Sequence, residues 1–297
     1  QVVKEIGTGA NLFDNGDLDY TVLADTYALQ YKESKQAHFV PKAMVGYLSP
    51  NHRREITGNE HVRKAFLQAI DKETFAKEIL GDGSTALNGF VPANFAKNPD
   101  TGEDFRKENG DLLPYNIKEA QANWTKAKEE LGKDKIELEL ISADSAIAKK
   151  TIEFVQGQLQ QNLPGLTIKL KSLPLQNRLD LQTAGNYDLA FGTWTPDYAD
   201  PINFLEFYDS KSGLNTSGYN DSAYDAGLQK VRKDYANEPE KRWNELLSLE
   251  KTLIEKDAGV LPLFQGAIGY LKSDRLQGLQ VFSFGRTVSY RLAYVEE

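Results

Sequence analysis

The chain has 297 residues, of which 40% are hydrophobic and 26% charged, so it is a globular protein rather than a disordered or fibrous one. Its formal net charge of −8 gives phosphate backbones and anionic lipids no electrostatic attraction, so no nucleic-acid partner is expected. It has no cysteine, which excludes thiolate and iron–sulfur chemistry, and no run approaches the ~18 apolar residues of a membrane-spanning segment.

The first predicted elements are a short strand and a long helix. An Asn15-Gly16 turn is followed by alternating apolar residues up to Leu23, which is typical of a strand. Residues 59–80 have apolar side chains at helical spacing, with Asn59 in position to cap one helix and Gly81 to end it.

A polar segment over residues 87–113 follows, and loops of this length usually cover or line a site. After it the pattern alternates between helix and strand. The expected elements are helices over 116–131, 145–163 and 174–184, and strands over 136–141, 166–171 and 187–193. Strands joined through helices must lie parallel, so we expect an α/β lobe over residues 60–205.

The last third of the chain predicts two helices and three short strands. The helices cover 224–235 and 239–256, and the strands cover 260–264, 268–272 and 279–284. Pro262 cannot donate to a ladder of hydrogen bonds, so its strand is expected at the edge of a sheet.

The segment after the strand at 187–193 carries the candidate binding residues. Ligands of parallel α/β sheets collect at the carboxyl ends of the strands, where Trp194 offers a rigid apolar wall and Asp197 a negative charge. Pro196 and Pro201 stiffen this loop. The alternative is structural: Trp194 belongs to the core and Asp197 caps the next helix.

Several motifs together resemble the extracytoplasmic oligopeptide- and dipeptide-binding proteins of ABC importers, and most closely the oligopeptide-binding lipoproteins of streptococci and related Gram-positive bacteria. The resemblance covers essentially the whole chain. The motifs are residues 187–201, which read YDLAFGTWTPDYADP, residues 218–225 (GYNDSAYD), 59–73 (NEHVRKAFLQAIDKE), 88–92 (NGFVP) and 114–120 (PYNIKEA).

The resemblance implies a periplasmic-binding-protein-like type II fold of the α/β class. Members of the family are about twice as long and have two lobes, so the chain is expected to correspond to the C-terminal half. It would then hold one α/β lobe and the C-terminal return segment of an incomplete first lobe. The implied division is 1–58, strand passage from the first lobe and hinge; 59–205, the second α/β lobe; and 206–297, hinge return and completion of the first lobe.

The resemblance also implies that an extended peptide is held between two lobes through its main chain. By comparison with the family motif, Gly192, Thr193, Trp194 and Thr195 would pair with the peptide backbone. Asp197, three residues after Trp194, would bind the peptide's α-ammonium group, and no cofactor, metal or catalytic residue is implied.

Phe191 is the sixth implied substrate-binding residue, and it departs from the family pattern. Some enteric members carry an arginine there that helps to hold the peptide's carboxylate. We therefore expect the charge from this position to be lost, which suits longer or variable peptides.

The implied partners are oligopeptides, the permease subunits of an ABC importer and the missing N-terminal half of the same protein. The implied location is the extracellular face of the cell membrane, with a lipid anchor at an N-terminus absent here.

Three alternatives remain open. One is an enzyme that pairs Asp197 with Asp200 or Glu206, although nothing else in the sequence supports catalysis. The second is a binding protein of this fold for a dipeptide, a metal chelate or a sugar. The third is a surface adhesin or antigen.

Overall fold

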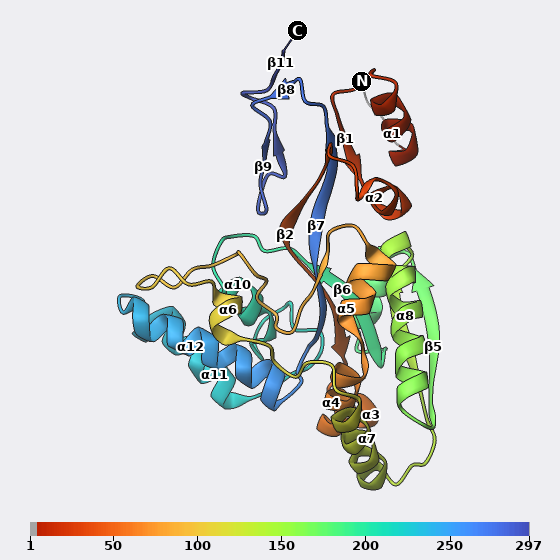
Figure 1. Ribbon diagram of the computed structural model, residues 1–297. Helices are drawn as coiled ribbons and strands as arrows, with labels where there is room; N and C mark the ends of the chain where they lie inside the picture. The colour runs from red at the N-terminus through yellow and green to blue at the C-terminus, as the bar shows by residue number, and fades with distance from the viewer. Residues whose placement is uncertain (1–4, 297) are drawn as a thin grey trace.

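Two long strands run side by side through the molecule, from a narrow part that holds both termini into a larger α/β part (Figure 1). The computed structural model describes residues 5–296. The strands are β2 (Ala37–Pro50) and β7 (Leu261–Lys272), which are antiparallel with Ala37 opposite Leu271 and Leu48 opposite Leu261. This pairing joins the two parts of the structure.

The main sheet has seven strands in the order β1-β7-β2-β6-β4-β5, with β3 paired to β7. β4 lies parallel to both β5 and β6, as the alternation of helices and strands predicts. The remaining strands of this sheet are β1 (Tyr20–Leu23), β3 (Thr85–Ala86), β4 (Ile136–Ala143), β5 (Leu166–Leu173) and β6 (Leu189–Trp194).

Two of the three helices that precede the parallel strands begin at a capping residue, as the sequence predicts. Ser145 accepts a hydrogen bond from the Ala148 N–H at the start of α8 (Ala146–Asn162), which joins β4 to β5. Asn116 does the same for α7 (Ile117–Leu131), and α9 (Leu175–Thr183) joins β5 to β6. Local capping chemistry therefore places α7 and α8, whereas α9 follows Pro174 without a side-chain cap.

The single helix predicted over residues 59–80 is wrong in one respect, because the chain breaks near its middle. Asn59 caps α4 (Glu60–Ala69) as expected. Ile70 then adopts an extended backbone, and Asp71 starts a new helix by accepting from the Thr74 N–H at 3.0 Å. The restarted segment is α5 (Lys72–Thr74), which continues as the π-helical turn η1 (Phe75–Leu80) up to Gly81. A second capping residue inside an apolar pattern therefore outweighs the helical periodicity.

The two strands predicted over 260–264 and 268–272 form the one continuous strand β7, which is central and not at an edge. Pro262 is tolerated because it is the second residue of β7, where only β2 lies alongside, and because β2 has a register shift between Gly46 and Tyr47. The missing N–H therefore falls beside a bulge and costs the sheet little.

Hydrophobic residues form one large core and a small separate cluster (Ile141, Tyr187 and Ala190) in the α/β part, and a further small core in the narrow part, made by Phe13, Leu23, Ala28 and Leu271. The other elements of the α/β part are α3 (Glu55–Gly58), α6 (Phe105–Asn109), α10 (Ile202–Leu205), η2 (Glu206–Tyr208), α11 (Ser222–Gln229), η3 (Lys230–Asp234), α12 (Pro239–Lys251) and η4 (Thr252–Lys256). Those of the narrow part are α1 (Ile6–Asp14), α2 (Asp25–Tyr31), β8 (Leu276–Gln277), β9 (Gln280–Val281), β10 (Val288–Ser289) and β11 (Tyr294–Val295).

The long segment 87–113 is fixed to α12 through the carboxylate of Glu250, which is completely buried. Its Oε1 accepts from the Phe90 N–H at 2.7 Å, the Val91 N–H at 2.8 Å and the Arg106 guanidinium at 2.7 Å. Its Oε2 accepts from the Asn109 amide at 2.6 Å. One buried charge therefore satisfies donors from several turns of this segment.

We expect Glu250→Gln in the full-length protein to lower the free energy of unfolding by about 3–5 kcal/mol, because it leaves Arg106 without its buried partner. Chemical denaturation measures this loss. The control is Glu240→Gln, an exposed acid on the same helix, which we expect to change stability by less than ~0.5 kcal/mol. Equal effects of the two substitutions would contradict the assigned role of Glu250.

Candidate functional site

The candidate site is an edge of β6 that no other strand covers. Leu189 and Ala190 pair with β4 on one side, opposite Leu140 and Ile141. From Phe191 to Trp194 the described strands pair with β6 only through β2. The carboxyl-terminal half of β6 therefore has one open edge, at the end of the parallel strands where ligands of such sheets bind.

The six predicted site residues lie along this edge and in the turn after it. Thr193, Thr195 and Asp197 are exposed, and Trp194 is half-buried. Gly192 is buried, and a side chain there would come within 3.1 Å of the Arg178 guanidinium. The Phe191 side chain is also buried, with its ring beside that of Phe264 in the core, so only the Phe191 backbone reaches the edge.

The direction of the free backbone groups follows from one side-chain contact. The Arg178 guanidinium of α9 donates a hydrogen bond to the Phe191 carbonyl at 3.0 Å. Residues two apart in a strand direct their N–H and C=O groups to the same edge, so those of Thr193 face the same side. Gly192 and Trp194 face β2 instead.

The turn that carries Asp197 is held by Asn203, a buried residue of α10. The Asn203 Oδ1 accepts from the Trp194 indole at 3.1 Å and from the Asp197 N–H at 3.3 Å. The Trp194 ring also meets Phe207 edge-on at 5.1 Å. These contacts fix the Asp197 backbone while its side chain is exposed, and within the described residues no cationic group lies within 4 Å of the carboxylate.

Asp200, rather than Asp197, makes the side-chain contact at the start of the next helix. Asp200 accepts from the Ile202 N–H at 3.0 Å at the start of α10, and it pairs with Arg242 at 2.8 Å. Glu206 is likewise held by Arg232 at 3.1 Å. Both acids that could have joined Asp197 in a catalytic pair are therefore neutralised by arginines.

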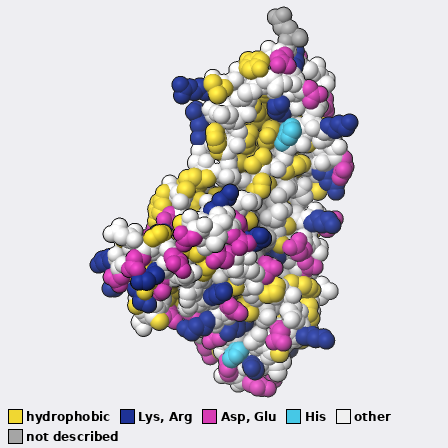
Figure 2. All heavy atoms as spheres, turned by 60° about the vertical axis from the view of Figure 1, so that its left-hand side comes forward, with side chains coloured by type: hydrophobic (Ala, Val, Ile, Leu, Met, Phe, Trp, Pro, Cys, Tyr) yellow, Lys and Arg dark blue, Asp and Glu magenta, His cyan; other side chains and the backbone are white. Residues whose placement is uncertain are grey.

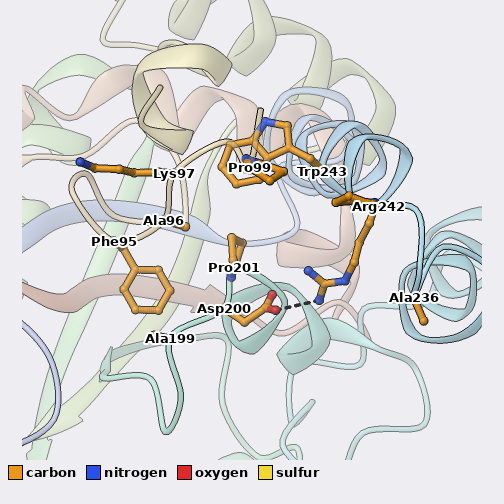
Figure 3. Close-up of a pocket in the computed structure, with 11 residues that line it drawn as sticks. Phe95, Ala96, Lys97, Pro99, Ala199, Asp200, Pro201, Ala236, Arg242 and Trp243 are labelled. Atoms are coloured by element: carbon orange, nitrogen blue, oxygen red, sulfur yellow. Dashed lines mark hydrogen bonds and ion pairs between the residues drawn. The ribbon is translucent and has the colours of Figure 1, made fainter. Parts of the chain in front are cut away.

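A hollow of about 390 Å³ lies beside the same turn, between segment 95–99 and α12 (Figure 3). Asp200 and Arg242 face each other across its wall, and Phe95 and Trp243 add apolar surface. It is lined by none of the six predicted site residues. The partly exposed Asp200 and Arg242 already neutralise each other, so the hollow offers no free carboxylate for a ligand at this pair.

Two of the three histidines, His52 and His61, have hydrogen-bonding partners. His52 contacts the Gly259 carbonyl at 2.9 Å, and burial lowers its pKa to about 4, so it is neutral at physiological pH. His61 pairs with Glu130 at 3.0 Å. Across residues 5–296 no cluster of potential metal ligands is found, and no helix there has both the length and the apolar character needed to cross a bilayer.

Two contributors to the site, Arg178 and Asn203, were not identified from the sequence. Arg178 lies 13 residues before the carbonyl it contacts and on another element. Asn203 belongs to the same conspicuous stretch as Trp194 and Asp197, but its role depends on how α10 turns back toward them. The local signal of such a turn is the Asp200-Pro201 pair, where Asp200 accepts a hydrogen bond from the Ile202 N–H.

Comparisons with known proteins identify the family. Residues 1–216 match the family described as "Bacterial extracellular solute-binding proteins, family 5 Middle". The chain is similar to the dipeptide-binding protein of Lactococcus lactis subsp. cremoris, with 30% identity over 100% of this chain and 56% of that protein. The chain thus spans about half the length of the curated relatives it matches.

Solved structures confirm the predicted fold. Listeria monocytogenes OppA bound to peptide has 37% sequence identity and a TM-score of 0.85, and the match covers 100% of this chain and 57% of that one. The substrate-binding domain of an oligopeptide ABC transporter from Bacillus anthracis has 33% identity and a TM-score of 0.87, over 100% of this chain and 58% of that one. The α/β fold is therefore of the periplasmic-binding-protein-like type II, and the family is one of solute-binding proteins rather than enzymes.

We expect Asn203→Ala in the full-length protein to loosen the Asp197 turn, because two donors lose their acceptor. The free energy of unfolding should fall by about 1–3 kcal/mol, and amide hydrogen exchange should accelerate across residues 194–199. The matched control is Asn177→Ala, at an exposed position of α9. Unchanged exchange in the Asn203 variant would show that another contact holds the turn.

Proposed function

The chain belongs to family 5 of the bacterial extracellular solute-binding proteins, and we propose that its full-length protein delivers extended oligopeptides to an ABC importer. The observation that carries this proposal is the open edge of β6 with, just beyond its end, the exposed Asp197 carboxylate, which has no cationic partner among residues 5–296. The open edge suits the backbone of an extended peptide, and the carboxylate suits its amino terminus.

The open edge supports binding by strand addition. The Thr193 N–H and C=O face the uncovered side, and the exposed Thr195 follows them. A peptide that lies along this edge hydrogen-bonds through its own backbone, so its affinity does not depend on its side-chain sequence. This is the property that a carrier of mixed peptides needs.

Asp197 supplies the charge for the peptide's amino terminus. Its backbone is fixed by Asn203, while its carboxylate is exposed and, among the described residues, has no cationic partner. A peptide running antiparallel to β6 brings its α-ammonium group to this end. One charge-assisted hydrogen bond there contributes about 1.5–3 kcal/mol, enough to set the register of the peptide.

The rest of the binding site belongs to the remaining length of the protein, since the chain spans 56% of its Lactococcus relative. Hydrophobic side chains gather on the narrow part of the molecule (Figure 2). Tyr290, Leu292 and Tyr294 are each more than half exposed there. We propose that the absent half packs on this surface, forms the first lobe and closes the peptide between two lobes.

The domain division into residues 1–58, 59–205 and 206–297 remains part of this proposal. Its outermost residues, 1–4 and 297, lie outside the described part of the chain. Two further inferences also remain part of this proposal. They are permease subunits as partners, and a lipid-anchored position on the extracellular face of a Gram-positive cell membrane.

Dipeptides are the second candidate ligand, because the Lactococcus relative is named a dipeptide-binding protein. The open edge of β6 presents the Phe191 N–H and both backbone groups of Thr193, and the chain continues past it to Thr195 and Asp197, which favours a ligand longer than two residues. Asp197 suits either one, since both have a free amine. A sugar offers this carboxylate no cation.

Purification of the full-length protein without denaturation, followed by mass spectrometry of the released ligand, tests the function. We expect a mixture of oligopeptides of differing sequence, because recognition through the main chain selects no side chain. Dipeptides alone would favour the second candidate, and a sugar or metal chelate would overturn peptide binding.

We expect Asp197→Asn in the full-length protein to weaken binding of a free peptide about 10- to 100-fold, the equivalent of one charge-assisted hydrogen bond. Binding of the N-acetylated peptide, which has no ammonium group, should be equally weak in both proteins. Isothermal titration calorimetry measures the four values.

Asp144→Asn is the control, since Asp144 is an exposed carboxylate just beyond the end of neighbouring β4. It should leave both affinities unchanged. If Asp197→Asn instead weakened the free and acetylated peptides equally, the carboxylate would not be recognising the amino terminus.

A further inference from the structure

Arg178 is a positively charged side chain at the opposite end of the open edge from Asp197. It is half-buried, and its Nη1 donates to the Phe191 carbonyl at 3.0 Å. Its Nε is buried without a hydrogen-bond partner. Within the described residues no carboxylate lies within 4 Å of its guanidinium. Among residues 5–296 the Phe191 carbonyl is therefore the one hydrogen-bond acceptor of this guanidinium.

A structural role alone does not explain this arrangement. Burial lowers the pKa of the Arg178 guanidinium, and the Tyr47 and Tyr187 hydroxyls act against that shift. A charge partly removed from water is unfavourable unless it is paired, whereas a neutral amide could hold the Phe191 carbonyl without this penalty. The guanidinium has five donors in a planar fork, and most of them are unused by the chain.

Its surroundings keep this fork in place. Gly192 approaches so closely that a side chain there would lie 3.1 Å from the Arg178 Nη1 and 3.4 Å from the Tyr47 hydroxyl. Tyr47 is itself buried opposite Gly192 on β2. The guanidinium is thus held against the backbone of β6 rather than extended into solvent.

The separation of Arg178 and Asp197 along β6 predicts the length of peptide that reaches both residues. From Thr195 back to Phe191 is four residues, or about 14 Å at the ~3.4 Å rise of a strand. A peptide that starts at Asp197 and runs antiparallel to β6 reaches Phe191 with about its fourth to sixth residue. Beyond that point the Phe191 carbonyl is already occupied by Arg178, so pairing with β6 ends there.

We propose that Arg178 is a specificity-determining residue that binds the terminal carboxylate of peptides about four to six residues long. This inference rests on the proposed function and deepens it. The charge that is lost from position 191 is supplied from α9 instead, by a side chain that reaches the Phe191 backbone. Carboxylates suit the guanidinium fork because two parallel N–H···O bonds can form.

The test uses the full-length protein and a series of peptides from two to eight residues, each with a free carboxylate and as the C-terminal amide. In the unsubstituted protein, amidation should weaken binding about 10-fold or more at a length near four to six residues, and little at eight. Arg178→Gln should remove that length-dependent difference while the dependence on a free amino terminus persists.

Arg53→Gln is the matched control, because Arg53 also donates to a main-chain carbonyl, that of Thr216 at 2.6 Å, but away from the β6 edge. It should retain the preference for carboxylates. Arg178→Lys provides a second variant in case the glutamine variant does not fold. Lysine has a single charged group in place of the fork, so the effect of amidation should fall.

Two results would overturn the inference. One is an amidation effect that is the same in the Arg178 variants as in the unsubstituted protein at every length. The other is an equal loss of affinity for all peptides in Arg178→Gln, which would show that the residue only positions β6. Absence of peptide binding, or no effect of N-acetylation, would instead be a failure of the proposed function.

Discussion

The candidate site depends on one mismatch between neighbouring strands. β4 follows β5 as far as Ala143 opposite Leu173, but it pairs with β6 only through Leu140 and Ile141. β2 continues along the other side of β6 to Trp194. The last residues of β6 therefore have strand geometry imposed by β2 and a second edge that pairs with no strand among the described residues, where Arg178 contacts the Phe191 carbonyl. Backbone groups in that position need water or another strand as partner, which is the physical basis for binding an extended chain there.

Much of the fold follows from local rules, and the errors arise where one local signal overrides another or where a neighbouring strand intervenes. The caps at Asn59, Asn116 and Ser145 place their helices because a side-chain oxygen satisfies a free N–H whatever the surroundings. The break at Ile70 and the central position of Pro262 are different. Each depends on what lies beside the backbone, a second cap in one case and a bulged neighbour in the other.

The candidate site shows the same division between local and distant signals. Motif resemblance indicated Asp197, and the structure places it exposed beyond the open edge. The same resemblance suggested that Phe191 takes the place of a charged group, yet its ring lies in the core. Arg178 approaches that backbone from α9, which no spacing rule relates to β6. Residues that act through their side chains at a distance in the sequence require the folded backbone to be known.

The charges at the two ends of the edge have a different role from the neutral groups between them. A neutral main-chain hydrogen bond contributes about 0.5–1.5 kcal/mol net, whereas one to a charged group contributes about 1.5–3 kcal/mol. Two charged ends can therefore rival several backbone bonds. Because every peptide has the same ammonium and carboxylate groups, such a site distinguishes ligands by length and direction while it ignores their sequence. A side-chain pocket at the same edge would instead select ligands by their sequence. Recognition of the terminus does not need a charged side chain at position 191, because Arg178 reaches the Phe191 backbone while the Phe191 ring lies in the core.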